Sequence, residues 1–473
     1  MQANSRSTGT ATPDDRRESE DDRRNRRRAV VASAIGAIIE WYDFGLYSIA
    51  AGLVFPALFF PSSDHVVGII NSFLVFAVGY VARPVGALIF GHYGDRLGRK
   101  GALIATILLM GIGTFVVALV PTYEHIGIWG AVILSVLRFL QGMGVGGEWS
   151  GAILVSMEWS RNGRRGLFAS WPQVGVPLGS LLANLAFGAA SFTTGSAFMT
   201  WGWRVPFAIS ALLVVLGLYM RLGLDETPVF RKAEAEGEVR PLPVLDAIRR
   251  HYKEIILISL LRMSELSSFI VFTVFVFTIG VQMLHFNRNF ILSALLVALA
   301  IECVFVPMAG GLSDRYGRKV IFMIGVAAAG LYSFVYFAGF ATGSAPVVFL
   351  LIALSLIPHG LQYGSEAALI TENFSANVRY SGSAIGYQLA SIFGGGPTPL
   401  IATALLVRDP SGYLVAGYLL LCSIISIVAT AFMKDGRHLD MSGQPAEPQM
   451  ESQMESQMGG KIGPLGQTSL SPR

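Results

Sequence analysis

Long apolar runs constrain the fold of this chain more than any other feature of its sequence. Runs of about 20 apolar residues are long enough to cross a bilayer as helices, and the chain contains twelve such runs. Only 14% of its residues are charged, against about 25% in soluble proteins, which argues against a water-soluble enzyme. The predicted spans lie near 29–55, 66–90, 101–120, 127–157, 166–190, 201–223, 254–283, 289–311, 319–340, 346–371, 380–407 and 412–433.

The basic residues between these spans indicate the orientation of the chain. Lys and Arg gather in the N-terminal tail, in alternate gaps and after the last span, whereas the other gaps contain only Arg204, Arg288 and Arg408. Loops rich in Lys and Arg stay in the cytoplasm, so we predict that both termini are cytoplasmic, which requires an even number of spans. Because the basic residues are spread between apolar segments and form no basic domain, we expect no nucleic-acid partner.

One charged gap is longer than the others and divides the chain into two halves. It covers 224–253 and is predicted to be a cytoplasmic linker between two six-helix bundles, 29–223 and 254–433. The tails, 1–28 and 434–473, lack apolar periodicity and are predicted to be disordered. The sequence therefore predicts an all-α integral membrane protein with twelve transmembrane helices, which we expect to be a monomer in the lipid bilayer.

A single motif occurs at equivalent positions in the two halves. Gly91-His-Tyr-Gly-Asp-Arg-Leu-Gly-Arg-Lys follows the second span, and Gly310-Gly-Leu-Ser-Asp-Arg-Tyr-Gly-Arg-Lys follows the eighth. Its glycines permit a tight turn, and its aspartate stands where the next helix begins. Such a repeat indicates duplicated bundles with a binding site at their interface; the alternative is a connecting turn with no role beyond topology.

This repeated motif resembles the signature loop of the major facilitator superfamily, and the resemblance covers about 29–433. It implies two pseudo-symmetric six-helix bundles that work by alternating access. In that family the loop stabilises one conformation through charge contacts between the bundles. The resemblance therefore implies that six residues act as a conformational switch and do not touch substrate: Asp95, Arg96, Arg99, Asp314, Arg315 and Arg318.

Further stretches resemble the metabolite:proton symporter branch of that superfamily. They include Glu40-Trp-Tyr-Asp-Phe in span 1, Arg138-Phe-Leu-Gln-Gly in span 4 and Trp201-Gly-Trp-Arg-Val-Pro-Phe at span 6. Leu261-Arg-Met-Ser-Glu-Leu in span 7 looks most like shikimate transporters, whereas dicarboxylate, citrate and osmolyte carriers are relatives. Antiporters of the superfamily have a long Gly-Pro motif in span 5. This sequence has only the shorter Gly175-Val-Pro-Leu-Gly there, and the shorter motif argues against export. The resemblance also implies a bacterial inner membrane.

Ionisable residues at membrane depth are functional candidates, because each is costly there and usually faces a cavity or a partner. Glu40, Asp43 and Tyr47 share one face of span 1, and a second polar face runs along span 4. Neighbouring carboxyls can share a proton, while an arginine is the bidentate donor that a carboxylate needs. We predict proton coupling at Asp43, Glu40 and Glu148, and substrate binding at Arg138, Gln141 and Tyr47. Pairing of Arg138 with an acid of span 1 is the alternative.

The second half offers candidates in spans 7, 10 and 11. Arg262 stands three residues from Glu265. A polar stripe with helical spacing runs along span 10 and consists of His359, Gln362, Tyr363 and Glu366. An internal Arg262–Glu265 pair and a packed histidine are the alternatives. We predict further substrate contacts at Arg262, His359, Gln362, Tyr363 and Gln388.

Enzymatic motifs are missing from the sequence. There is no phosphate-loop, no nucleophile elbow and no pair of Cys or His at metal spacing, so we expect no enzyme activity, no cofactor and no metal. The sequence predicts a secondary active transporter that takes up a small organic acid with a proton, and the resemblance favours a shikimate-like hydroxylated monocarboxylate. The alternatives are a symporter for a dicarboxylate, tricarboxylate or betaine-like osmolyte, a proton-driven exporter, and a transporter-like sensor.

Overall fold

The computed structural model describes residues 20–61, 65–160, 163–235, 243–375 and 377–436. All regular secondary structure within these ranges is helical. The first half consists of α1 (Glu20–Leu53), α2 (Phe55–Phe59), α3 (His65–Arg96), α4 (Arg99–Val117), α5 (Tyr123–Ile126), α6 (Trp129–Glu158), α7 (Arg165–Gln173), α8 (Gly175–Thr194), η2 (Gly195–Ala197), η3 (Phe198–Gly202) and α9 (Arg204–Leu222).

Two short helices follow, α10 (Pro228–Ala235) and α11 (Pro243–Arg250), within the segment predicted as the linker. The second half consists of α12 (Tyr252–Leu261), α13 (Met263–Ile270), η4 (Val271–Phe275), η5 (Thr278–Met283), α14 (Arg288–Tyr316), α15 (Arg318–Phe340), α16 (Ala345–Leu354), α17 (Leu356–Thr371), α18 (Arg379–Ala390), η6 (Ser391–Gly395), α19 (Thr398–Arg408) and α20 (Tyr413–Phe432).

Within the described residues, 11 helices are long and apolar enough to cross a membrane. The remaining predicted span, 380–407, is broken into α18, the π-turn η6 and α19. The break falls at Gly394-Gly-Gly-Pro397, where three glycines weaken the helix and Pro397 cannot donate a backbone hydrogen bond. Together, these segments account for the twelve spans that the sequence predicts.

Glycine allows helices to approach closely inside each half. A Cβ added to Gly142 or Gly146 of α6 would collide with the backbone of α3, at Gly79 and Arg83 respectively. In the second half a Cβ at Gly364 of α17 would collide with the carbonyl of Val306 in α14. Small residues at helix contacts are how membrane helices pack without a hydrophobic driving force. These glycines therefore have a packing role.

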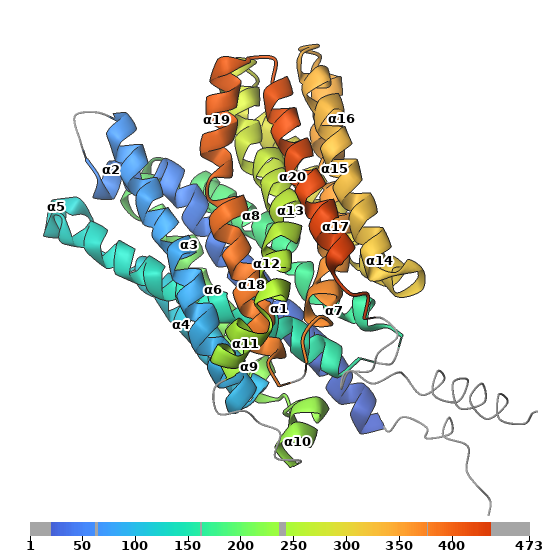
Figure 1. Cartoon of the computed structure of the whole chain (residues 1–473). Helices are drawn as coiled ribbons and strands as arrows, with labels where there is room; N and C mark the ends of the chain where they lie inside the picture. The colour runs from blue at the N-terminus through green and yellow to red at the C-terminus, as the bar shows by residue number, and fades with distance from the viewer. Residues whose placement is uncertain (1–19, 62–64, 161–162, 236–242, 376, 437–473) are drawn as a thin grey trace, which may run out of the picture.

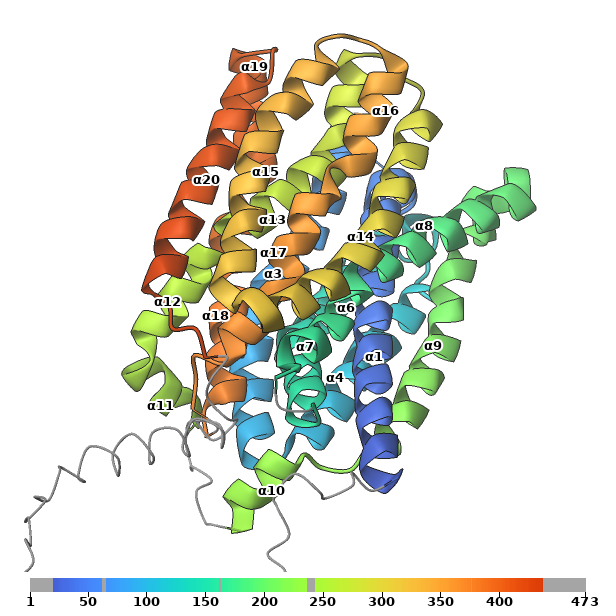
Figure 2. The ribbon, with the colours of Figure 1, turned by 90° about the vertical axis from the view of Figure 1, so that its right-hand side faces the viewer.

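The two halves meet at the end of the molecule where α10 and α11 lie, here called the linker end. The main contacts between them join α3 to α18 and α7 to both α14 and α17. Toward the opposite end the halves diverge, with α2 and α5 to one side and α16 and α19 to the other (Figure 1). Figure 2 shows α7 in the lower part of the molecule, beside α14 and α17. The linker end is therefore closed by direct helix contact in this conformation.

The N-terminal tail differs from its prediction where the structure describes it. Helix α1 begins at Glu20, so residues 20–28 are helical, whereas we expected 1–28 to be disordered. Asn25 donates a hydrogen bond to Asp225, which follows α9, at 3.3 Å. The predicted tails otherwise lie outside the described residues, apart from 434–436. The boundaries of the two predicted bundles stay a prediction.

Candidate functional site

The first of two matching contacts at the linker end involves Asp95, in the last turn of α3. Its carboxylate accepts hydrogen bonds from the backbone N–H groups of Tyr380, at 3.3 Å, and Ser381, at 2.8 Å. The hydroxyl of Ser381 donates a third, at 2.7 Å. Because α18 begins at Arg379, the carboxylate occupies the positive end of a helix from the other half. Asp95 thus ties the two halves together.

Asp314 makes the corresponding contact in the opposite direction. It lies near the end of α14 and accepts from the backbone N–H groups of Gly166, at 2.8 Å, and Leu167, at 2.9 Å. These groups open α7, which belongs to the first half. A carboxylate from each half therefore binds the start of a helix in the other half. The switch role implied for both aspartates stays a prediction.

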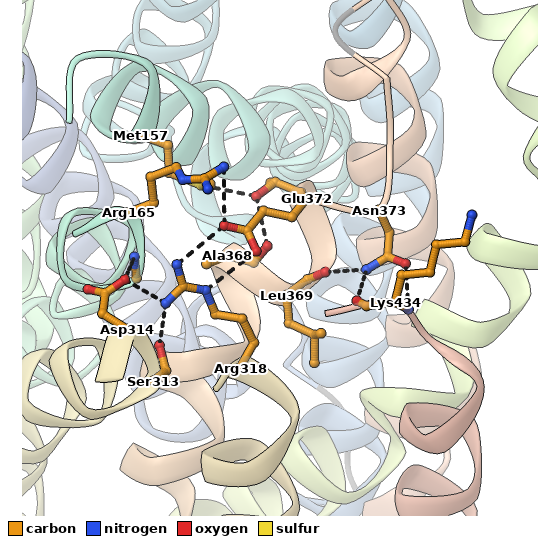
Figure 3. Close-up of polar contacts among 12 residues, drawn as sticks. Met157, Arg165, Ser313, Asp314, Arg318, Ala368, Leu369, Glu372, Asn373 and Lys434 are labelled. Atoms are coloured by element: carbon orange, nitrogen blue, oxygen red, sulfur yellow. Dashed lines mark hydrogen bonds and ion pairs between the residues drawn. The ribbon is translucent and has the colours of Figure 1, made fainter. Parts of the chain in front are cut away.

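Buried arginines surround both aspartates. Arg318 contacts Asp314 at 2.5 Å and Glu372 at 3.3 Å, and Arg165 reaches the same Glu372 at 3.6 Å from the other half. Figure 3 shows Arg165 and Arg318 converging on Glu372, with Asp314 on the far side of Arg318. The Arg165–Glu372 ion pair therefore crosses the interface beside the helix caps.

The other arginines of the repeated motif are placed differently. Arg99 lies 3.5 Å from Asp95 and 3.7 Å from Glu158, and all three are buried. Arg96 and Arg315 are exposed to the surroundings, and Arg315 lies over the ring of Tyr316. Of the six predicted switch residues, the structure brings Asp95, Arg99, Asp314 and Arg318 to the interface but leaves Arg96 and Arg315 outside it.

Asp43 belongs to a hydrogen-bonded chain within the first half. Its carboxylate accepts from the amide of Gln141 at 3.3 Å, and the same amide donates to the hydroxyl of Thr114 at 2.9 Å. The three residues come from α1, α6 and α4 and are all buried. Asp43 and Gln141, both predicted site residues, are thereby brought together. Their hydrogen-bonded chain ends at Thr114, to which the sequence analysis gave no role.

Arg138, one helical turn before Gln141, is buried among aromatic rings. Its guanidinium carbon lies 4.5 Å from the ring centre of Tyr47, 4.8 Å from that of Phe76 and 5.2 Å from that of Phe44. Among the described residues, neither its Nε nor the Tyr47 hydroxyl has a hydrogen-bond partner. The ion pair with a span 1 acid, which we kept as an alternative, is not formed there. Rings interact favourably with a guanidinium but leave its in-plane N–H donors available to an anion.

Glu148, in contrast, is fully engaged. It pairs with Arg221 of α9 and accepts a hydrogen bond from the Thr106 hydroxyl at 2.7 Å. Arg221 also donates to the backbone carbonyl of Leu103. All of these groups are buried inside the first half, so the geometry gives Glu148 a structural partner in this conformation. Glu40 lies buried in α1 under the combined electrostatic influence of Glu148, Arg83 and Arg221.

The second half ties its buried arginine to carboxylates. Arg262 joins α12 to α13 and contacts Glu265 at 2.8 Å and Glu366 at 3.5 Å. It also donates to the carbonyl of Tyr387 at 2.7 Å, and its guanidinium carbon lies 3.3 Å from the centre of the Tyr387 ring. The internal Arg262–Glu265 pair, offered above as the alternative to substrate binding, is therefore formed.

His359 lies between two carboxylates of the same half. Its Nδ1 contacts Glu302 of α14, and its Nε2 lies 3.3 Å from Glu265 of α13. With Arg262 and Glu366 these residues form a continuous buried network, here called the acid–base network (Arg262, Glu265, Glu302, His359 and Glu366). The histidine thus has protein partners at both ring nitrogens.

Aromatic and amide side chains connect this network to the first half. Tyr387 stacks on Trp149 of α6 with ring centres 3.6 Å apart, and its hydroxyl lies 3.2 Å from that of Tyr363. Trp149 donates to Gln173 at 2.8 Å, and Gln173 donates to the Tyr363 carbonyl at 3.1 Å. Movement between the halves therefore changes the surroundings of Tyr387 directly.

Two predicted substrate contacts have protein partners instead. The Gln362 amide donates to the carbonyls of Gly325 and Pro358 at 3.3 and 3.4 Å, which places it against α15. The Gln388 amide donates across the interface to the Val145 carbonyl at 3.4 Å. In this conformation both amides serve packing between helices.

Sequence reasoning gave no role to several residues of this centre, which are Thr114, Trp149, Gln173, Arg221, Glu302 and Tyr387. Glu302 carries a charge inside an apolar span, which is a signal available from sequence. Arg221 was counted with the basic loop after span 6, and only the packing of α9 places it beside Glu148. The uncharged members give no comparable signal.

Comparison with known proteins agrees with this architecture. Residues 33–399 match the family model of the Major Facilitator Superfamily. The inner membrane metabolite transport protein YhjE of Escherichia coli is 38% identical, over 91% of this chain and 99% of its own length. The shikimate transporter of Escherichia coli is 37% identical, over 86% and 94%. The glycine betaine/proline/ectoine/pipecolic acid transporter OusA of Dickeya dadantii is 32% identical, over 88% and 84%.

A solved structure shares the fold at low sequence identity. The proton:xylose symporter XylE, bound to 6-bromo-6-deoxy-D-glucose, superposes with a TM-score of 0.70 at 16% identity, covering 91% of this chain and 99% of its own. The relatives are membrane transporters and not enzymes, and together with the apolar helices they identify a multi-pass inner membrane protein. This chain belongs to the major facilitator superfamily of metabolite transporters.

Proposed function

We propose that this protein takes up a small organic acid together with protons by alternating access. The observation that carries the proposal is Arg138, a buried guanidinium held by aromatic rings with its Nε unpaired beside the unpaired Tyr47 hydroxyl. Leaving such donors unsatisfied in a buried place is costly. A carboxylate binding in the plane of the guanidinium would satisfy them and would gain charge-assisted hydrogen bonds.

The substrate class follows from the same groups and from the relatives. A guanidinium with a phenol hydroxyl and the Gln141 amide one turn away suits an acid that also carries hydroxyl groups. The shikimate transporter among the relatives makes a hydroxylated monocarboxylate the favoured cargo. A betaine-like substrate is the second candidate, because OusA transports such solutes by its name and aromatic rings attract quaternary ammonium groups.

We further propose that the linker end faces the cytoplasm, with both termini on that side. The uneven distribution of Lys and Arg supports this orientation. In this conformation the contacts of Asp95 and Asp314 hold the cytoplasmic end closed, which corresponds to the state that accepts substrate from outside. The opposite state requires both helix caps to separate.

The test is uptake by the purified protein in liposomes. Labelled shikimate, citrate, a benzoate-type acid and glycine betaine are offered under an imposed inward proton gradient, with and without a protonophore. We expect saturable accumulation of one acid that the protonophore abolishes. Failure of the whole panel with folded, inserted protein would contradict uptake. Accumulation of glycine betaine alone would favour the second candidate.

Asp43 is the coupling carboxyl proposed in the first half. A protonated Asp43 no longer competes with the substrate for the positive charge of Arg138, which acts on it electrostatically. We expect Asp43→Asn to abolish accumulation against a gradient, measured with the same liposomes. Normal proton-driven accumulation by this variant would remove Asp43 from coupling.

A further inference from the structure

The acid–base network of the second half contains more acidic than basic groups. Its three carboxyls, Glu265, Glu302 and Glu366, share two cationic groups, Arg262 and His359. The side chains of all five are at most 5% exposed. Even with a protonated histidine, one negative charge is left over. An unpaired buried charge costs several kcal/mol, so the network is neutral only when one carboxyl binds a proton.

Hydrogen bonding distinguishes the three carboxyls. Glu302 and Glu265 each bond to His359 through one oxygen, and Glu265 also forms an ion pair with Arg262. Glu366 has only the longer 3.5 Å approach of Arg262, and among the described residues neither of its oxygens has a hydrogen-bond partner. A buried carboxylate without donors is the least favourable of the three.

The cations that act on Glu366 are the two already counted in the network, Arg262 and His359. Arg262 approaches from the α12–α13 junction and Glu265 from α13, while α17 itself contributes His359 and Tyr363. Glu302 of α14 reaches the group through His359, and Tyr387 comes from α18. Helix α7 places the uncharged Gln173 beside Tyr363, and α15 places Gly325 beside Gln362. The arginines of these two helices, Arg165 and Arg318, contact Glu372 at the end of α17.

We propose that Glu366 is a proton-binding site of this carrier, occupied while the linker end is closed. The inference rests on the proposed function, to which it adds a proton site in the second half that is separate from Asp43. One proton binds one carboxylate oxygen, and the neutral acid removes the surplus charge. No other bond changes.

Contacts between the halves connect this proton to the conformation. Tyr387 covers the guanidinium of Arg262 and stacks on Trp149, and Ser383 of α18 bonds to Ser150 of α6 at 3.0 Å. Opening the linker end separates α18 from α6 and removes Trp149 from Tyr387. Water then reaches Arg262 and Glu366, a solvated carboxylate no longer needs neutralisation, and the proton leaves on the linker side.

The direct test is infrared difference spectroscopy of the full chain in liposomes without substrate. A protonated carboxyl has a C=O absorption that a carboxylate lacks. We expect such a band at neutral pH in the unsubstituted protein and its loss in Glu366→Gln. The matched control is Glu254→Gln, which removes a half-buried acid of the second half that lies near a histidine, His251, and leaves the band unchanged.

Further variants keep the test decisive. Should Glu366→Gln fail to fold, Glu366→Asp retains the acid, and its band is expected to shift in frequency. A band that is absent from the unsubstituted protein or that survives Glu366→Gln unchanged would overturn the assignment. A band that shifts in Glu302→Asp or Glu265→Asp but not in Glu366→Asp would do the same. Because no substrate is added, these results stand even where uptake of every tested acid fails.

Discussion

Arg138 and Arg262 are both buried in the membrane part of the molecule, but their partners are opposite in kind. Arg138 is surrounded by aromatic rings and forms no ion pair with a carboxylate among the described residues, whereas Arg262 contacts two carboxylates and a backbone carbonyl. The same side chain therefore provides an anion site in one half and an internal neutralising charge in the other. The groups around each arginine therefore decide whether the arginine is available to a substrate anion or neutralises carboxylates of the protein.

The two halves also make equivalent contacts at the linker end but not at the centre of the molecule. At the linker end, Asp95 and Asp314 make equivalent caps on α18 and α7. At the centre the correspondence is lost, because Asp43 has an amide as its partner while Glu265 and Glu302 have a histidine. We infer that the symmetric contacts serve the motion that both halves share, and that the asymmetric centre separates anion binding from proton binding.

Substituting the two arginines gives the largest expected effects and tests the comparison directly. Arg138→Gln removes the free guanidinium, and because charged hydrogen bonds contribute about 1.5–3 kcal/mol each, we expect substrate affinity to fall by roughly 100-fold or more. Its thermal stability is expected to change little, since no ion pair is broken. Substrate binding by calorimetry and thermal unfolding measure the two quantities.

Arg262→Gln is expected to lower thermal stability more than substrate affinity. It leaves Glu366 without its ion-pair partner and Glu265 with His359 alone. Breaking a buried ion pair from one side costs about 3–5 kcal/mol. Unfolding should therefore occur at a clearly lower temperature. Equal stability losses in Arg138→Gln and Arg262→Gln would show that the two arginines are used alike.

Substitutions in the Glu148–Arg221 pair test whether Glu148 has a structural role in the first half. Glu148→Gln or Arg221→Met alone leaves a buried charge unpaired and is expected to lower the unfolding temperature strongly. The double variant removes both charges and should recover much of the loss, which a double-mutant cycle by thermal unfolding detects. Additive losses would argue for separate roles and would return Glu148 to proton coupling.

The helix caps at the linker end give the smallest and most local effects. Asp95→Ala should speed hydrogen exchange at the amides of Tyr380 and Ser381, and Asp314→Ala should do so at those of Gly166 and Leu167. Loss of a charge-assisted cap costs about 1–2 kcal/mol, which corresponds to roughly tenfold faster exchange. Mass spectrometry of both segments in both variants shows whether the two caps open independently. No change at either segment would contradict their role.

The helices could be predicted from sequence because their signals are local. Apolar length gave the spans, and the repeat around Asp95 and Asp314 gave the duplicated architecture. The break at Gly394–Pro397 could have been predicted from sequence, since glycine and proline both weaken a helix. The helical start at Glu20 was not expected, because residues 20–28 are mostly charged and the apolar run of the first span begins only near residue 29.

The site was only partly predictable because ion pairs depend on packing between distant segments. Arg262 and Glu265 stand one turn apart, so their pair follows from helical spacing. Glu148 and Arg221 lie on different helices, and Glu302, the partner of His359 in α14, is also far from it in sequence. For Arg138 the decisive feature is the lack of an acidic partner among the described residues, which no spacing rule reveals.

Proton movement caused by substrate tests the central claim, that an acid anion bound at Arg138 crosses the membrane together with protons. Shikimate is added to liposomes containing the carrier without any imposed gradient, and the pH of the outer medium is followed. We predict an alkaline shift that saturates with shikimate concentration and is absent in Arg138→Gln liposomes. Entry of labelled shikimate with no change in external pH would contradict the account.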